Sequence, residues 1–166
     1  MEFIEVVEKL KKIALFSDFA DDNEKLLKVY KLMKIEKYSS GSSIINEGDM
    51  GDKLFILNKG TVKILRNTLN NEKYAVALLS SDDNIFFGEL ALIDNDKRSA
   101  TVIAESDCEV LSIHQDQFMK LCEENPLMGF KITLKIAKRL SGTLRKMNKD
   151  VIVLFEALVG EVEGDF

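Results

Sequence analysis

Histidine and cysteine are scarce in this sequence of 166 residues, which contains one histidine and two cysteines. Metal sites draw on clusters of His, Cys, Asp and Glu. His114 has no companion at ligand spacing, so we expect a structural histidine and no metal site. Cys108 and Cys122 show neither a pairing nor a metal-binding spacing, and we interpret both as buried free thiols.

Long apolar runs and an excess of basic residues are also missing. No apolar stretch approaches the ~18 residues that a membrane span requires, so we expect no membrane partner. The N-terminal residues MEFIEVVEKLKK show no secretory signal, which predicts a cytoplasmic protein. The net charge is −5, whereas binding to a phosphate backbone draws on clustered Lys and Arg. The sequence therefore predicts no direct nucleic-acid partner.

The chain length suits one domain, 1–166, and its first part, 1–33, predicts helices. A second helix is expected to start at Asp21, with Glu24 three residues later as in a capping box, and to end near Met33. The first helix is predicted by apolar residues at helical spacing, namely Phe3, Val6, Val7, Leu10, Ile13 and Ala14.

Residues 34–114 have the pattern of an all-β region. Short runs of β-forming residues are separated by turn residues, and five of the nine glycines lie between residues 41 and 88. Short turns rather than helices join the runs, which favours a jelly-roll β-barrel over a parallel sheet. The runs are SIINEG, DKLFILNKG, TVKILRN, KYAVALLSSDD, SATVIAESD and CEVLSIH.

Residues 115–159 return to a helical period. The segment QDQFMKLCEE predicts a short helix, and Asn125 as N-cap with Pro126 at the first position starts a long one. We expect the long helix to end at Gly160. Because little sequence follows, we expect a stand-alone module, unless the sequence is a fragment of a longer protein. The predicted fold class is α+β, mainly β, with a jelly-roll β-barrel, N-terminal helices and a long C-terminal helix.

The long helix also carries a coiled-coil pattern, from which we expect a homodimer. The extra apolar residues Ile152, Val153 and Phe155 leave open the alternative that the helix folds back onto its own barrel. The apolar residues that follow one another at alternating steps of three and four are Ala137, Leu140, Leu144, Met147, Val151, Leu154 and Leu158.

The most informative stretch is FGELALI at residues 87–93, followed after Asp94 to Lys97 by RSATV at residues 98–102. Together with INEGDMGDKLFILNKGTVKI upstream, it closely resembles the phosphate-binding cassette of cyclic-nucleotide-binding domains. Cyclic-nucleotide-regulated kinases, channels and bacterial catabolite activators share this cassette. The resemblance covers roughly residues 12–145 and implies a site for a 3′,5′-cyclic nucleotide.

The residue types suit such a ligand. Gly88 would let the backbone approach closely, and the residues after it resemble a single helical turn whose free N–H groups face the phosphate. Arg98 would supply a forked positive donor and Ser99 a hydroxyl donor to the phosphate. Glu89 would accept a hydrogen bond from the ribose 2′-hydroxyl.

The resemblance adds residues around these. It places the backbone of Leu90 and Ala91 against the ligand and includes Ala100 in the cassette. On the long helix, Arg139 and Thr143 lie in a segment similar to the catabolite activators, whose Thr at this offset reaches the adenine amino group. Those proteins follow the Thr with a Ser, where this sequence has Leu144.

Several alternatives remain open. We expect cAMP, because the Ser of RSA resembles bacterial cAMP receptors, with cGMP as the other possibility. A Glu and an Arg nine residues apart could also form a plain surface ion pair. Relatives of the fold sense haem or a small organic acid, although those generally lose the Glu and the Arg, and a structural dimerisation module is a further alternative. The sequence predicts a regulatory or sensor module without catalytic residues, acting on an unknown downstream protein.

Overall fold

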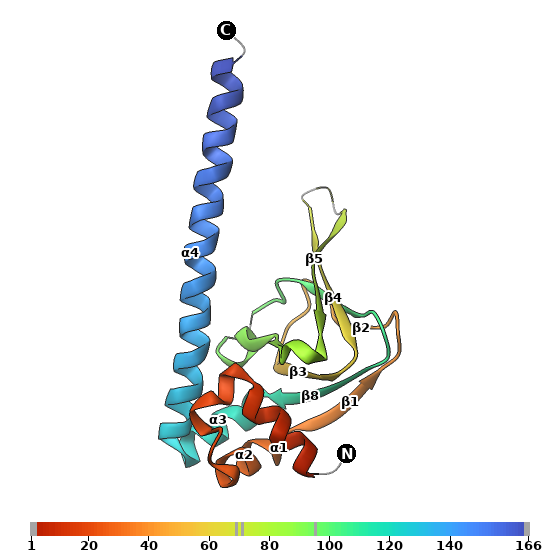
Figure 1. Cartoon of the computed structure of the whole chain (residues 1–166), viewed down its shortest axis with the longest axis vertical. Helices are drawn as coiled ribbons and strands as arrows, with labels where there is room; N and C mark the ends of the chain where they lie inside the picture. The colour runs from red at the N-terminus through yellow and green to blue at the C-terminus, as the bar shows by residue number, and fades with distance from the viewer. Residues whose placement is uncertain (1–2, 69, 71, 95, 165–166) are drawn as a thin grey trace.

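The computed structural model describes residues 3–68, 70, 72–94 and 96–164 (Figure 1). The chain begins with α1 (Phe3–Lys12), the 3₁₀ helix η1 (Ala14–Phe19) and α2 (Asn23–Tyr30), and it ends with α3 (Gln115–Glu124) and α4 (Pro126–Gly164). The strands between them are β1 (Lys34–Tyr38), β2 (Ser43–Ile45), β3 (Lys53–Lys59), β4 (Thr61–Asn67), β5 (Lys73–Ser80), β6 (Phe86–Phe87), β7 (Thr101–Ala104) and β8 (Cys108–His114), with short 3₁₀ helices η2 (Ser81–Asp83) and η3 (Glu89–Leu92).

The strands form two antiparallel sheets, in the orders β1-β8-β3-β6 and β2-β7-β4-β5. This jelly-roll-like arrangement, with helices before it and a long helix after it, confirms the predicted fold class. The jelly roll consists of a pair of sheets, and no ladder among the described strands joins the two.

Strand β3 lies between two apolar cores, which explains its nearly continuous apolar sequence. Leu54 and Ile56 point into a core shared with the helices, whereas Phe55 and Leu57 point between the sheets. The short strand β6 pairs with β3 and divides in the same way, with one phenylalanine in each core. Strand β6, which leads directly into Gly88, therefore packs against both cores.

The helix ends differ from the prediction in local detail. The first helix stops at Lys12, and the chain continues as η1. Asp22 rather than Asp21 caps α2, because its carboxylate accepts the Lys25 N–H at 3.0 Å. At the start of α4 the carbonyl of Asn125 accepts from the N–H of Gly129. The side chain of Asn125, which was expected to cap the helix, accepts from Lys28 Nζ at 3.2 Å.

Two further expectations were wrong. Helix α4 runs through Gly160 to Gly164, because a single glycine lowers helix stability without ending the helix. Cys122 is only half-buried, whereas Cys108 is buried as expected, and both thiols are free.

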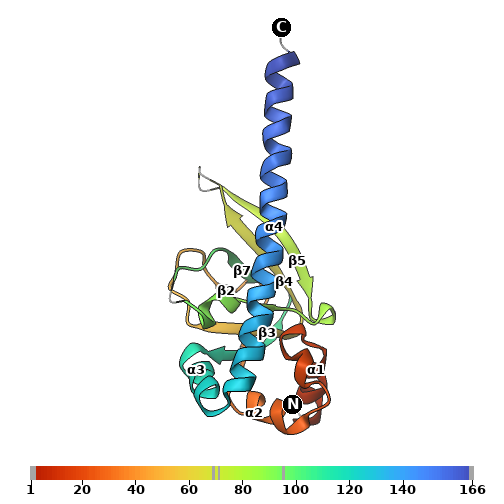
Figure 2. The ribbon, with the colours of Figure 1, turned by 90° about the vertical axis from the view of Figure 1, so that its left-hand side faces the viewer.

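Among the described residues, the buried apolar contacts of helix α4 lie near its start. Met128, Ile132 and Ile136 are buried in the helical core, while Leu144 and the residues of the coiled-coil pattern beyond it are exposed. Figures 1 and 2 show the distal part of the helix extending beyond the sheets, so this part does not fold back onto its own barrel. No helix among the described residues is both long and apolar enough to cross a membrane.

Candidate functional site

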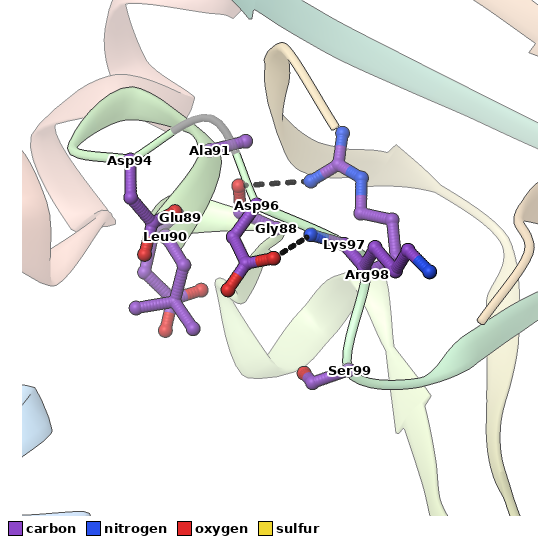
Figure 3. Close-up of a pocket in the computed structure, with 9 residues that line it drawn as sticks. All are labelled: Gly88, Glu89, Leu90, Ala91, Asp94, Asp96, Lys97, Arg98 and Ser99. Atoms are coloured by element: carbon purple, nitrogen blue, oxygen red, sulfur yellow. Dashed lines mark hydrogen bonds between the residues drawn. The ribbon is translucent and has the colours of Figure 1, made fainter. Parts of the chain in front are cut away.

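A cavity of about 250 Å³ lies at the predicted cassette (Figure 3). Figure 3 shows Glu89, Leu90 and Asp94 on one side of it and Lys97 and Arg98 on the other. The residues that line it are Gly88, Glu89, Leu90, Ala91, Asp94, Asp96, Lys97, Arg98 and Ser99. The structure therefore brings together most of the residues that the sequence predicted, and all of these come from one continuous segment.

Gly88 fixes the geometry at the entrance to η3. Its φ of 72° lies in the left-handed region that favours glycine. A Cβ at this position would lie 2.7 Å from Arg98 Nη1 and 3.1 Å from the Lys53 carbonyl oxygen. The turn thus needs glycine both for its backbone conformation and for the close approach of the arginine.

Arg98 is a half-buried cation held by backbone carbonyls. Its Nη1 donates to the Gly88 oxygen at 3.2 Å and its Nη2 to the Lys53 oxygen at 2.8 Å, and the guanidinium lies 5.8 Å from the centre of the Phe55 ring. Burial lowers the pKa of Arg98 below its usual value, while the charges of Asp52 and Glu89 oppose this shift. An arginine with such partners stays protonated, so the cavity wall carries a fixed positive charge.

The loop between β2 and β3 encloses the other side of this arginine. The Arg98 N–H donates to the Asp49 carbonyl at 2.8 Å, and its own carbonyl accepts from Gly48. A Cβ on Gly51 would lie 2.6 Å from Arg98 Cζ. Sequence reasoning did not assign this role to Gly51, although it belongs to the quoted segment INEGDMGD, where the run of glycines is the available signal.

A half-buried polar network supports strand β3, whose Lys53 carbonyl holds Arg98. Glu36 accepts from Ser112 Oγ at 2.5 Å, from Tyr38 at 2.8 Å and from Lys53 Nζ at 3.0 Å. Burial alone would raise the pKa of Glu36, but these three donors lower it below its usual value. Burial and the neighbouring carboxylate raise the pKa of Tyr38 to about 12. The network fixes Lys53, whose carbonyl in turn accepts from Arg98.

Glu89 is paired with the long helix. Its side chain is 14% exposed, and its Oε1 lies 3.4 Å from Arg139 Nε. The Arg139 guanidinium also lies 4.3 Å from the centre of the Phe86 ring and donates to the Phe86 carbonyl at 3.4 Å. Arg139 is therefore adjacent to the cavity through Glu89, and Phe86 is a supporting residue that the sequence analysis did not identify.

Thr143 and Ala100 do not line the cavity. Thr143 is exposed, one turn beyond Arg139 on the free part of α4. Asp94, Asp96 and Lys97 line the cavity, although the sequence analysis treated them only as the spacing between two motifs. The described residues that line the cavity therefore include none from α4, and the structure does not bring Thr143 to it.

The histidine and the carboxylates form no metal-binding cluster within the part of the chain that the structure describes. His114 Nδ1 lies 3.3 Å from Asp52 Oδ2, beside the loop that encloses Arg98. The inner part of the cavity wall combines the half-buried cation of Arg98 with the half-buried carboxylate of Glu89, whereas Asp94, Asp96 and Lys97 line it as exposed residues. The inner pair suits a small anion that also carries hydroxyl groups.

Comparison with known proteins agrees with this geometry. Residues 35–125 match the family model described as cyclic nucleotide-binding domain. The "Cyclic AMP receptor protein" of Thermus thermophilus is 31% identical over 103 residues, which are 62% of this chain and 47% of that protein. The chain spans about half the length of the curated relatives it matches.

Solved structures share the fold. A cyclic nucleotide-binding domain from Methylobacillus flagellatus matches with a TM-score of 0.75 and 25% identity, over 90% of this chain and 82% of that one. The regulatory domain of Toxoplasma gondii PKA, crystallised with cAMP, matches with a TM-score of 0.69 and 26% identity, over 82% of this chain and 48% of that one. With more than half of its residues matched by the family model, this chain belongs to the cyclic nucleotide-binding domain family.

Proposed function

We propose that this chain binds a 3′,5′-cyclic nucleotide, cAMP in particular, in the cavity between Gly88 and Ser99, and that it acts as a regulatory module without enzymatic activity. The observation that carries the proposal is the fixed guanidinium of Arg98 in the wall of a cavity that also presents Glu89. A cyclic monophosphate has one negative charge and one free hydroxyl on its ribose, and these two groups match the two side chains.

The phosphate would lie against Arg98. Two of its N–H donors are used by carbonyl oxygens, and a guanidinium has five, so donors remain for phosphate oxygens. The first N–H groups after Gly88 have no acceptor within their own turn, as at the start of any helical turn. The Ser99 hydroxyl lies on the same cavity and would add a neutral donor.

The ribose would lie against Glu89. A carboxylate only accepts hydrogen bonds and has room for several, so Glu89 can accept from a 2′-hydroxyl while it remains beside Arg139. Arg139 orients this carboxylate through its contact with Oε1. It also gives the pocket a direct connection to α4, because a ligand that touches Glu89 changes the surroundings of a helix residue.

The proposal of cAMP rests on Ser99 and on relatives whose names include cAMP, such as the Thermus thermophilus receptor and the Toxoplasma gondii PKA domain with its ligand. A side-by-side calorimetric titration of the purified chain with cAMP and cGMP tests it. We expect saturable binding of one nucleotide per chain, with cAMP bound more tightly. No binding of either nucleotide at millimolar concentration would leave a dimerisation module as the better account.

We also propose that α4 pairs with α4 of a second copy of the chain. Support comes from the exposed apolar residues at alternating steps of three and four, which include Leu144 at 59%, Met147 at 53% and Val151 at 62% exposure. Water-exposed apolar rows of this length mark interaction surfaces. A ligand that alters the Glu89–Arg139 contact would then bias the geometry of the pair, since a ligand shifts an equilibrium only through different contacts in the two states.

A further inference from the structure

The distal segment of α4, residues 150–159, is apolar around nearly its whole circumference. Between residues 151 and 159 only Glu156 is polar. The large apolar side chains there are 38 to 66% exposed, and they are Val151, Ile152, Val153, Leu154, Phe155, Leu158 and Val159. A helix that is apolar all round is stable in water only when it is covered on all sides.

Pairing with one other helix covers only part of this surface. With Val151 and Leu154 at the contact positions of the coiled-coil pattern, Ile152 and Val153 lie on opposite flanks and face away from the partner. In a four-helix arrangement each helix contacts two neighbours, and its apolar face widens beyond these contact positions. The exposed flanks therefore fit additional helices of the same kind.

The charges of α4 indicate the direction of those helices. From Asp150 to Val159 the only charged residues are two acids, Asp150 and Glu156. The preceding part, from Lys131 to Lys149, contains no acid and is basic through Lys131, Lys135, Lys138, Arg139, Arg145, Lys146 and Lys149. An antiparallel overlap sets Glu156 of one helix beside the basic residues of another, whereas a parallel overlap sets Glu156 beside Glu156.

We propose that the distal segment binds the distal segments of a second α4 pair that runs in the opposite direction, so that two dimers associate tail to tail into a tetramer. This inference rests on the proposed pairing of α4. Figure 1 shows the end of α4 extending beyond the rest of the molecule, so the sheets do not obstruct the overlap. The cavities lie toward the other end of the helix, away from the contact.

Sedimentation equilibrium of the full chain between 10 and roughly 200 µM tests the assembly, a range chosen for micromolar association. We expect a tetramer, which Ile152→Ser/Val153→Ser converts to a dimer because neither side chain lies on the seam within one pair. A wild type that remains dimeric over the whole concentration range would contradict the tetramer proposal and agree with the proposed pairing of α4. A monomeric wild type would contradict both proposals.

Charge exchange tests the direction. Glu156→Lys is expected to weaken tetramer formation by about tenfold, as its new charge meets Lys146 and Lys149 of the opposing helix. Adding Lys146→Glu/Lys149→Glu to the same chain should restore it, whereas the control Lys138→Glu, outside the overlap, should not. If Glu156→Lys strengthens assembly, or if the added changes fail to restore it, the antiparallel arrangement is wrong.

Discussion

Arg98 is the residue on which binding should depend most strongly. The proposed phosphate would be largely desolvated, and removing the only half-buried cation that lines the described cavity leaves the anion without a partner. We expect Arg98→Ala to weaken cyclic-nucleotide binding by at least a hundredfold, on the order of 3–5 kcal/mol. Isothermal titration of the variant measures the loss. An unchanged titration curve would contradict the assignment of the phosphate position.

Glu89 should determine the response to the ribose hydroxyl. A 2′-deoxy analogue is expected to bind the wild type more weakly by roughly 1.5–3 kcal/mol, the range for a hydrogen bond to a charged group. In Glu89→Ala this difference should largely vanish, because the acceptor is gone. Competition binding of both ligands to both proteins gives the comparison. Equal losses in the two proteins would mean that another residue accepts from the hydroxyl.

Gly51 should matter for binding although it does not line the proposed cavity. The Cβ of Gly51→Ala would displace the Arg98 guanidinium, and we expect about a tenfold loss of affinity, comparable with one hydrogen bond. Gly142→Ala is the matched control, because a Cβ there meets no other atom within 4 Å. Titrations of the two variants should differ. Equal affinities would show that Arg98 adjusts freely.

At the scale of the element, α4 consists of a packed beginning and a free remainder. The double substitution Leu144→Asp/Val151→Asp places charges on the proposed seam and should yield a monomer at tens of micromolar, by light scattering. Its binding cavity should remain intact, since both residues are exposed and neither lines the cavity. Lys138→Asp, which lies off the seam and outside the proposed tetramer overlap, serves as the control. Dimers that persist in the double variant would exclude this seam.

At the scale of the whole molecule, the Glu36 network should link stability to pH. The pKa of Glu36 is lower in the folded protein than in the unfolded chain. The ionised carboxylate therefore contributes its full stabilisation above the unfolded-state pKa of Glu36, and this contribution is lost as the pH falls through the folded-state pKa. We expect Glu36→Gln to lower the free energy of unfolding by about 1–2 kcal/mol at pH 7 and by progressively less below about pH 4.5.

Urea unfolding at a series of pH values measures this dependence. Glu105→Gln is a suitable control, because the pair of Glu105 with Lys63 is largely exposed. A difference between the wild type and Glu36→Gln that is constant from pH 7 to pH 3.5 would show that the network does not act through the charge of Glu36.

The sequence by itself determined most of the strands and helices and the chemistry of the cassette. Alternation, turn glycines and helical spacing are local properties, so β3, β8, α3 and η3 could be predicted from neighbouring residues. Gly88, Glu89, Arg98 and Ser99 lie within one short segment, and their meeting at one cavity needs only a turn. The strand β6 was missed, because two residues carry no period.

Only the tertiary structure decided the contacts between distant segments. Arg139 meets Glu89 across fifty residues of sequence, and the loop at Gly51 encloses Arg98, because the sheets bring these segments together. The apolar row of α4 fits either packing onto its own barrel or pairing with another chain. In the structure the distal part of this row, from Leu144 onward, is exposed and not packed onto the sheets, because the buried beginning of α4 already covers the apolar side chains of the helical core. Pairing with another chain stays a proposal.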